Sequence, residues 1–219
     1  ENGVYRKSSG FGPTNVTVLT RVDADTEALG AHRDVLGPPT TEARRNAVDS
    51  LGKSITERKA AGGKTDLFLV FAGHGDLAHG EGFLELEDGP LTAAGLEHEV
   101  VAKLPADRVH LVLDSCNSFF MLYPRKPGGK RWDLRVEAPV GLLERFPNVG
   151  AVVSTSAEAI TWEWSELRGG LFSHEVRSGL RGAADVDRDG TISYAELASF
   201  LDSANKDVPD ETYKPNVFL

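Results

Sequence analysis

Apolar runs alternate with amphipathic stretches along the chain, and this alternation predicts an α/β protein. The run Leu67–Ala72 is apolar without interruption, and Val109–Leu113 and Gly150–Ser154 are further short runs, a pattern typical of buried parallel strands. The stretch Val16–Thr20 is also predicted to be a strand. Strands that alternate with helical segments imply a mostly parallel central sheet flanked by helices on both faces.

The segments between these strands carry helix and turn patterns. Helices are predicted after the capping residues Thr41 and Thr92 and over Leu171–Arg181 and Ser193–Ala204, and a short hairpin is predicted over Phe83–Gly89. The chain has no internal repeat, low-complexity tract or clear linker. We therefore interpret residues 1–219 as a single domain.

Composition and charge narrow the class of protein. The 219 residues suffice for one domain with a sizeable core. The 24 basic and 33 acidic residues give a formal net charge of −9, which argues against binding to nucleic acid or to anionic membranes by bulk attraction. No apolar run is long enough to span a bilayer, and no signal peptide is visible. The single cysteine, Cys116, excludes an internal disulfide and fits a reducing compartment, so we expect a cytoplasmic protein.

Two of the predicted strands end in residues that can carry chemistry. The first core strand runs into Gly-His-Gly, centred on His74, and the second runs into Asp-Ser-Cys, which ends at Cys116. Adjacent parallel strands would bring both to one edge of the sheet, where an imidazole can act as general base for a thiol and then protonate a leaving amine. The backbone N–H groups of Gly75 and Cys116 could face a developing oxyanion. Each motif also has a simpler interpretation, as a tight turn and as a buried thiol with helix-capping neighbours.

In these motifs the chain resembles the caspase and metacaspase superfamily, in particular its prokaryotic caspase-like members. The resemblance spans residues 14–204 and rests on Phe-Ala-Gly-His-Gly at 71–75, Leu-Asp-Ser-Cys-Asn-Ser at 113–118 and Gly-Leu-Arg-Gly-Ala-Ala-Asp at 179–185. It implies a caspase-like three-layer sandwich, with His74 as the catalytic histidine and Cys116 as the nucleophile. It also implies that the oxyanion hole is formed by the amides of Gly75 and Cys116.

The resemblance implies a substrate pocket as well. Asp114 matches the position that lines the primary specificity pocket, where aspartate-specific caspases carry glutamine and metacaspases, which cleave after Arg or Lys, carry aspartate. A buried carboxylate can pair bidentately with a guanidinium and rejects an acidic side chain. The alternative is that Asp114 only caps the next helix. Ser154, Ser156 and Trp162 follow the third core strand, where the family builds more of the cleft, although the tryptophan could instead belong to the core.

Two further expectations concern segments around this domain. A caspase fold has a strand between those that correspond to Val16–Thr20 and Leu67–Ala72, and the residues before Val16 are polar and glycine-rich. We therefore expect a longer polypeptide, in which a cleaved N-terminal fragment supplies the missing strand. The basic, Pro- and Gly-rich stretch 123–132 is expected to be an exposed loop. Cutting it would match the activation of a caspase zymogen, and a solvated loop without that role is the alternative.

Residues 185–196 match a twelve-residue EF-hand calcium loop at every position. Ligands are expected from the carboxylates of Asp185, Asp187 and Asp189, the backbone carbonyl of Thr191, and Glu196 at position twelve. Such loops usually act in pairs and the sequence holds one, so a structural loop without an ion is the alternative. The expected chemistry needs no cofactor, and Ca²⁺ is the ion that the pattern indicates.

The sequence thus predicts a cysteine endopeptidase, a hydrolase that cleaves proteins or peptides after Arg or Lys through Cys116 and His74. The resemblance points to regulated proteolysis in defence, stress response or cell death. One alternative is a calcium-responsive binding module on a caspase-like fold, without turnover. Another is a different hydrolase or an acyltransferase that uses the same pair. Neither nucleic acid nor a membrane is an expected partner.

Overall fold

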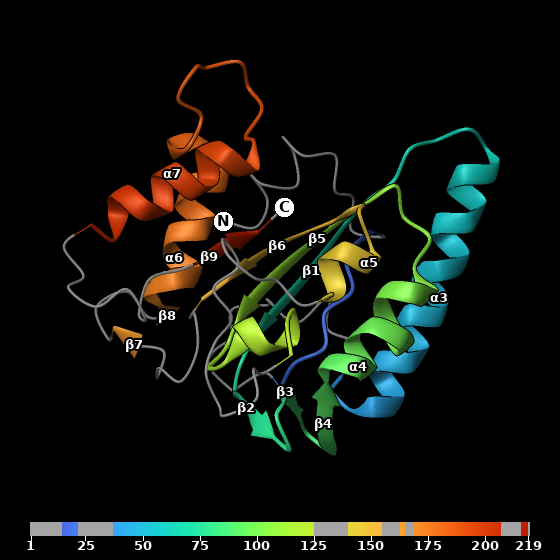
Figure 1. Cartoon of the computed structure of the whole chain (residues 1–219). Coiled ribbons are helices and arrows are strands. Elements are labelled where there is room, and N and C mark those ends of the chain that lie inside the picture. The colour runs from blue at the N-terminus through green and yellow to red at the C-terminus, as the bar shows by residue number, and fades with distance from the viewer. Residues whose placement is uncertain are drawn as a thin grey trace.

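The structure, a computed structural model, describes residues 15–21, 37–124, 140–154, 163–164, 169–206 and 216–218. Its centre is a four-stranded sheet in the order β1 (Asp66–Ala72), β5 (Arg108–Asp114), β6 (Val149–Val153) and β9 (Asn216–Phe218) (Figure 1). The first three strands run parallel, and β9 pairs with β6 in the antiparallel direction. The predicted mostly parallel sheet is confirmed, and β9 has no counterpart in the sequence prediction.

Helices connect and cover these strands. They are α3 (Thr41–Ala60), α4 (Ala93–Gly95) with the π turn η3 (Leu96–Val100) and the 3-10 turn η4 (Val101–Lys103), the 3-10 turn η5 (Ser118–Met121), α5 (Leu142–Arg145), α6 (Leu171–Ser178) with the π turn η7 (Gly179–Ala183), and α7 (Tyr194–Ala204). In Figure 1, α3 and α4 lie on one side of the sheet, and α6 and α7 lie on the other. Within the described ranges, no helix is both long enough and apolar enough to cross a membrane.

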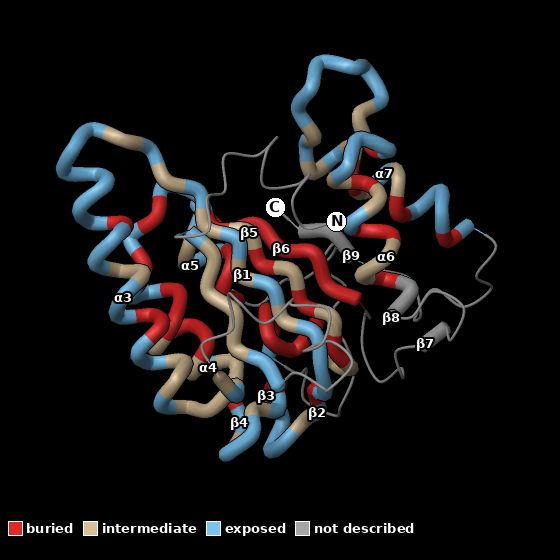
Figure 2. Tube along the Cα trace, turned by 180° about the vertical axis from the view of Figure 1, so that it is seen from behind, coloured by how far each residue is buried: buried red, intermediate tan, exposed pale blue. Residues whose placement is uncertain are grey.

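The two faces of the sheet belong to two hydrophobic cores, because side chains alternate along each strand. Val109, Leu111 and Leu113 of β5 are at most 1% exposed and pack in one core together with buried residues of α3. Val112 of β5 and Val152 of β6 face the other core, which α6 and α7 complete. Figure 2 shows β6 buried along its whole length. The chain therefore has the predicted three-layer α/β architecture.

β1 is buried on one face only, which corrects the prediction of a fully buried strand. Leu67, Leu69 and Phe71 pack against the first core, whereas Phe68 and Val70 are 42% and 67% exposed. Within the described part of the chain, β5 is the only strand that pairs with β1. An uninterrupted apolar run allows both faces of a strand to be buried. Each face is buried only where another layer of the protein covers it.

Two predictions about the first elements are also wrong in detail. Val16–Thr20 is not a strand, since its one ladder contact is an isolated bridge at Val18. Five residues with strand propensity need a neighbour along their length before they form a ladder. Helix α3 is capped by Thr40, whose hydroxyl accepts a hydrogen bond from the Ala43 N–H at 3.2 Å, one residue before the expected Thr41.

A smaller antiparallel sheet follows the end of β1. It consists of β2 (Gly75–Ala78), β3 (Glu81–Leu86) and β4 (Gly89–Thr92). The turn between β3 and β4 is the predicted hairpin. Because β2 begins directly after His74, this sheet holds the segment that leaves β1. A separate two-residue pair is formed by β7 (Glu163–Trp164) and β8 (Gly169–Gly170).

Tyr194 anchors the start of α7 on the central sheet. Its ring lies over Gly150 of β6, where a Cβ atom would come within 2.4 Å of the ring. The Tyr194 hydroxyl hydrogen-bonds Nδ1 of His110 at 2.8 Å, and the His110 ring stacks on both Phe68 and Tyr194. Burial lowers the pKa of His110 and raises the pKa of Tyr194 to about 12, so this pair is uncharged at neutral pH.

We expect Gly150→Ala to lower the free energy of unfolding by about 1–3 kcal/mol, because the added methyl group would displace the Tyr194 ring from β6. Urea denaturation measures this change. In a background that already carries Tyr194→Ala, the same substitution should cost much less, since the displaced ring is absent. An equal cost in both backgrounds would contradict the contact.

Candidate active site

His74 and Cys116 follow the ends of the paired strands β1 and β5. The two strands are parallel neighbours, and their last aligned pair is Ala72 and Asp114. The N–H of Gly73 donates to the Asp114 carbonyl at 3.0 Å, which continues the ladder by one step. His74 and Cys116 each lie two residues past the aligned pair. The structure thus places both at the carboxyl edge of the sheet, where α/β proteins bind their ligands.

Gly75 lies directly against the backbone of Cys116. A Cβ atom at Gly75 would lie 2.7 Å from the Cys116 carbonyl oxygen and 2.9 Å from Oγ of Ser115. On the other side, the His74 carbonyl accepts a hydrogen bond from the Glu85 N–H at 2.9 Å. The His74–Gly75 segment is therefore fixed between the Cys116 turn and β3, and only glycine fits there.

The chain turns sharply after Cys116. Asn117 has a φ of 56°, in the left-handed region that asparagine tolerates better than most residues. Its Nδ2 donates to Oδ1 of Asp76 at 3.3 Å, which joins this turn to β2. Cys116 is half-buried and His74 is exposed. The Cys116 side chain is therefore partly enclosed by the protein, whereas the His74 side chain is open to solvent.

Asp114 is half-buried at the end of β5 and bonds to α6. The hydroxyl of Ser173, in the first turn of α6, donates to Oδ2 of Asp114. Burial raises the pKa of the Asp114 carboxyl, and the bonds from Ser173 oppose that rise. The turn η5 after Cys116 follows Asn117 and has no side-chain cap. The alternative that Asp114 caps the next helix therefore does not hold.

Ser154 lies beneath this edge, with only 3% of its surface exposed. Its hydroxyl accepts from the Ser115 N–H and donates to the Ser115 carbonyl, both at 3.0 Å. A hydroxyl has one proton to give, so a proton given to Ser115 is not available to Asp114. Ser154 thus supports the turn before Cys116 from within the protein. The other two predicted cleft residues, Ser156 and Trp162, lie outside the described residues.

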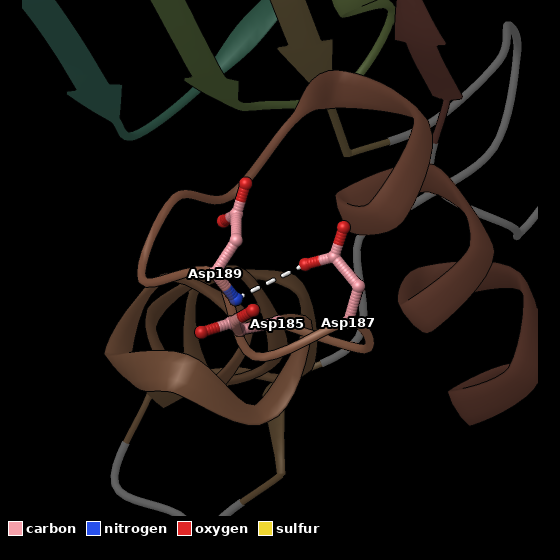
Figure 3. A group of neighbouring side chains, drawn as sticks. All are labelled: Asp185, Asp187 and Asp189. Atoms are coloured by element: carbon pink, nitrogen blue, oxygen red, sulfur yellow. Dashed lines mark hydrogen bonds between the residues drawn. The ribbon is translucent and has the colours of Figure 1, made fainter.

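The acidic loop between η7 and α7 gathers three carboxylates. One oxygen from each of Asp185, Asp187 and Asp189 lies within 4.8 Å of the others (Figure 3). Oδ1 of Asp187 accepts from the Asp189 N–H at 3.1 Å, as the dashed line shows. Oδ1 of Asp185 is buried and has no hydrogen-bond partner among the described residues. A buried carboxylate oxygen without a partner destabilises the folded protein unless another group or an ion binds it. Carboxylate oxygens are what a hard cation such as Ca²⁺ prefers, so the donor set fits one.

Glu196, the expected ligand at position twelve, is not in this group of carboxylates. Its Oε2 accepts from the N–H and hydroxyl of Ser193 at 2.9 and 2.8 Å, and its Oε1 accepts from the Val186 N–H at 3.2 Å. The bonds from Ser193 form a capping box at the start of α7 and lower the pKa of Glu196. Thr191 contributes its N–H to Oδ1 of Asp189 at 2.6 Å.

Sequence reasoning missed three residues at the strand edge: Asp76, Asn117 and Ser173. Asn117 carries a local signal, because asparagine after a strand often occupies a left-handed turn. Ser173 carries none that a single sequence shows. It lies 59 residues from Asp114 along the chain, and only the packing of α6 on the sheet brings the two together.

A separate cavity of about 580 Å³ lies elsewhere in the fold. Phe120, Tyr123 and the ion-paired Glu97 and Arg145 are among its lining residues. Neither His74 nor Cys116 lines it. We therefore regard it as distinct from the strand-edge site.

Comparisons with known proteins give no family. No protein-family model and no curated protein matches the chain. Among solved structures, it is similar to caspase-1 from Spodoptera frugiperda, with 16% identity, 84% of this chain and 69% of that chain covered, and a TM-score of 0.49. It is also similar to the protein GSU0716 from Geobacter sulfurreducens, with 18% identity, 91% and 84% covered, and a TM-score of 0.45. At these values neither likeness assigns a function, and any assignment rests on the strand-edge site.

We expect Gly75→Ala to lower the free energy of unfolding by about 1–3 kcal/mol, because the new Cβ would press on the Cys116 backbone. Gly95→Ala in α4 is the matched control. There the nearest atom is the end of the Leu91 side chain at 3.0 Å, which can move aside, so little or no loss is expected. Chemical denaturation compares the two variants, and equal stabilities would contradict the proposed close contact at Gly75.

Proposed function

We propose that this protein is a cysteine endopeptidase, with Cys116 as nucleophile and His74 as general base. The observation that carries the proposal is the contact between the two strand ends, where Gly75, next to His74, packs on the backbone of Cys116. A thiol and an imidazole at the carboxyl edge of a parallel sheet are the groups that nucleophilic catalysis requires. The resemblance of both motifs to those of caspases and metacaspases supports the same assignment.

The proposed reaction has two stages. First, the imidazole of His74 takes the thiol proton of Cys116, and the thiolate attacks the carbonyl carbon of the scissile peptide bond. The imidazolium then gives its proton to the leaving amine as the C–N bond breaks, and an acyl-thioester remains on Cys116. Second, His74 deprotonates a water molecule, which hydrolyses the thioester and regenerates the thiol.

The amides of Gly75 and Cys116 are the proposed donors to the oxyanion. The backbones of these two residues are in contact, so their N–H groups belong to one packed unit. Donors that are fixed in advance stabilise developing charge without reorganisation during the reaction. The close packing at Gly75 supports this role, because it leaves the donors little freedom to move.

Asp114 is the proposed selector of Arg or Lys in the substrate. Its carboxylate is half-buried, and no basic side chain among the described residues forms an ion pair with it. A carboxylate in such a place gains most from a cation that the substrate supplies, and it repels an acidic side chain. The biological setting that the resemblance implies is regulated proteolysis in defence, stress response or cell death.

Fluorogenic peptides with Arg, Lys or Asp at the cleaved position test the proposal. We expect the protein to cleave after Arg and Lys, and Cys116→Ala to abolish cleavage. His74→Ala should lower kcat/KM by roughly 100-fold or more, because the general base is lost. His98→Ala, which removes an exposed histidine of η3, is the control and should leave kcat/KM unchanged.

The remaining outcomes separate the alternatives. Cleavage after Asp that depends on Cys116 would retain the nucleophile and reject the role of Asp114. Cleavage that survives Cys116→Ala would reject the mechanism. The absence of any turnover would favour a binding module without catalysis, and thioester formation without peptide cleavage would favour an acyltransferase.

The acidic loop supports a second proposal, that this protein binds Ca²⁺. Asp185, Asp187 and Asp189 would hold the ion together with the carbonyl of Thr191, and the buried Oδ1 of Asp185 is the specific observation in favour. Glu196 would have to give up bonds of its capping box before it could join them. The ion would supply charge to the loop and take no part in the proposed peptide cleavage.

We expect the melting temperature to rise as Ca²⁺ increases from micromolar to millimolar concentrations. An ion present at about 100 times its Kd adds about 2.7 kcal/mol to the free energy of unfolding. Asp187→Asn and Asp189→Asn should abolish the rise, whereas Asp202→Asn, an exposed acidic residue of α7, should preserve it. A melting temperature that Ca²⁺ does not change would reject the site.

Two further expectations stay predictions. Within the described residues β1 pairs with β5 on one edge, and its other edge supports an extended segment, from a cleaved fragment, that adds to the sheet there. Native mass spectrometry of protein isolated from its source would detect such a bound peptide. In the basic stretch 123–132, whose cutting would match activation of a zymogen, the candidate processing sites are Arg125, Lys126, Lys130 and Arg131, and these four residues lie outside the described residues.

A further inference from the structure

Helix α6 begins beside the strand edge that carries Asp114. Ser173, in its first turn, donates its hydroxyl to Oδ2 of the Asp114 carboxylate. Phe172 and Val176 of the same helix are buried in the second core. Because these neighbours fix α6 on the sheet, the backbone of Ser173 stays beside Asp114.

A hydrogen bond from a donor on a fixed helix restricts the orientation of an aspartate side chain. Oδ2 is engaged by Ser173, so the remaining lone pairs of the carboxylate face a defined direction. Hydrogen bonds to the charged form also offset the cost of burying it. The hydroxyl of Ser154 is committed to Ser115, which leaves Ser173 as the main donor to this carboxylate among the described residues.

We propose that Ser173 is a positioning residue for substrate selection, which holds the Asp114 carboxylate in the orientation that receives a basic side chain. This inference rests on the proposed peptidase function. A competing explanation is purely structural, in which Asp114 stabilises the N-terminal turn of α6 and Ser173 is simply its partner. The two explanations differ in what they predict for substrates with and without a charge.

The test compares kcat/KM for matched peptides that end in Arg or in citrulline, its uncharged isostere. We expect Ser173→Ala to lower the Arg-to-citrulline ratio about tenfold, because a hydrogen bond to a charged group is lost. Ser173→Thr, which retains the hydroxyl, should restore most of the ratio. Ser178→Ala is the matched control, since this half-buried serine of α6 bonds the His174 carbonyl at 2.8 Å, and it should leave the ratio unchanged.

The pH profile provides a second measurement. Loss of the Ser173 donor raises the pKa of Asp114 further, so its charged form is reached only at higher pH. The acid limb of kcat/KM for the Arg substrate should therefore move to higher pH in Ser173→Ala. The other titratable groups on the surrounding elements are His74, Asp76, Cys116, His174, Glu175 and Arg177 near this edge, and Asp66, Arg108 and His110 further along β1 and β5; β6 carries none. The pH dependence of kcat/KM for the citrulline substrate reports the titration of these other groups. It should be the same in Ser173→Ala and in the unmodified protein.

The outcomes distinguish this inference from the proposal beneath it. Cleavage after Arg with an unchanged ratio and an unmoved profile in Ser173→Ala would overturn the inference alone. A loss of stability in Ser173→Ala without a change in ratio would establish the structural explanation in its place. Absence of cleavage that depends on Cys116 in the unmodified protein would reject the peptidase function and, with it, the role of Ser173.

Discussion

The register between β1 and β5 is the constraint on which the candidate site depends. Ala72 and Asp114 are the last aligned pair, so the residues that follow each strand leave the sheet at the same level. A shift by one residue would reverse the facing of every side chain in one strand. Val109, Leu111 and Leu113 are almost fully buried on one face of β5, and this burial makes such a shift costly. The hydrophobic core thus places His74 and Cys116 at the same edge of the sheet.

Much of this arrangement could be predicted from the sequence, because short apolar runs bounded by polar residues specify core strands. β5 and β6 were predictable in this way, and so was the edge of the sheet at which the candidate site lies. The fold around β1 was less predictable. Phe68 and Val70 are apolar residues of the types found in buried strands, but their exposure depends on which layer covers them. No local pattern contains that information.

The residues of the candidate site also fall into two groups. Some are predicted by a short local motif, and others depend on contacts between segments that are distant in the sequence. The motif residues Gly75 and Cys116 were recognisable because each sits in a short pattern with its own chemical meaning. Ser173 was not, since its importance comes from a bond across 59 residues of sequence. The acidic loop is intermediate. Its three aspartates come together as the pattern predicts, whereas Glu196 matches the pattern and is engaged in capping α7.

Helices α6 and α7 connect these separate features into one unit. Asn205, after the end of α7, donates to the carboxylate of Glu175 in α6 at 2.5 Å, and both helices pack in the second core. The unit contacts the sheet at Asp114 through Ser173 and at His110 through Tyr194. The acidic loop joins the two helices, and Tyr194 lies between Ser193 and Glu196, the two residues of the capping box. An ion that drew Glu196 into its coordination would therefore compete with the cap of the helix that carries this contact. The three mutually repelling carboxylates would favour an ion and the capping box would oppose it, so the balance between them would set the affinity of the loop for the proposed Ca²⁺.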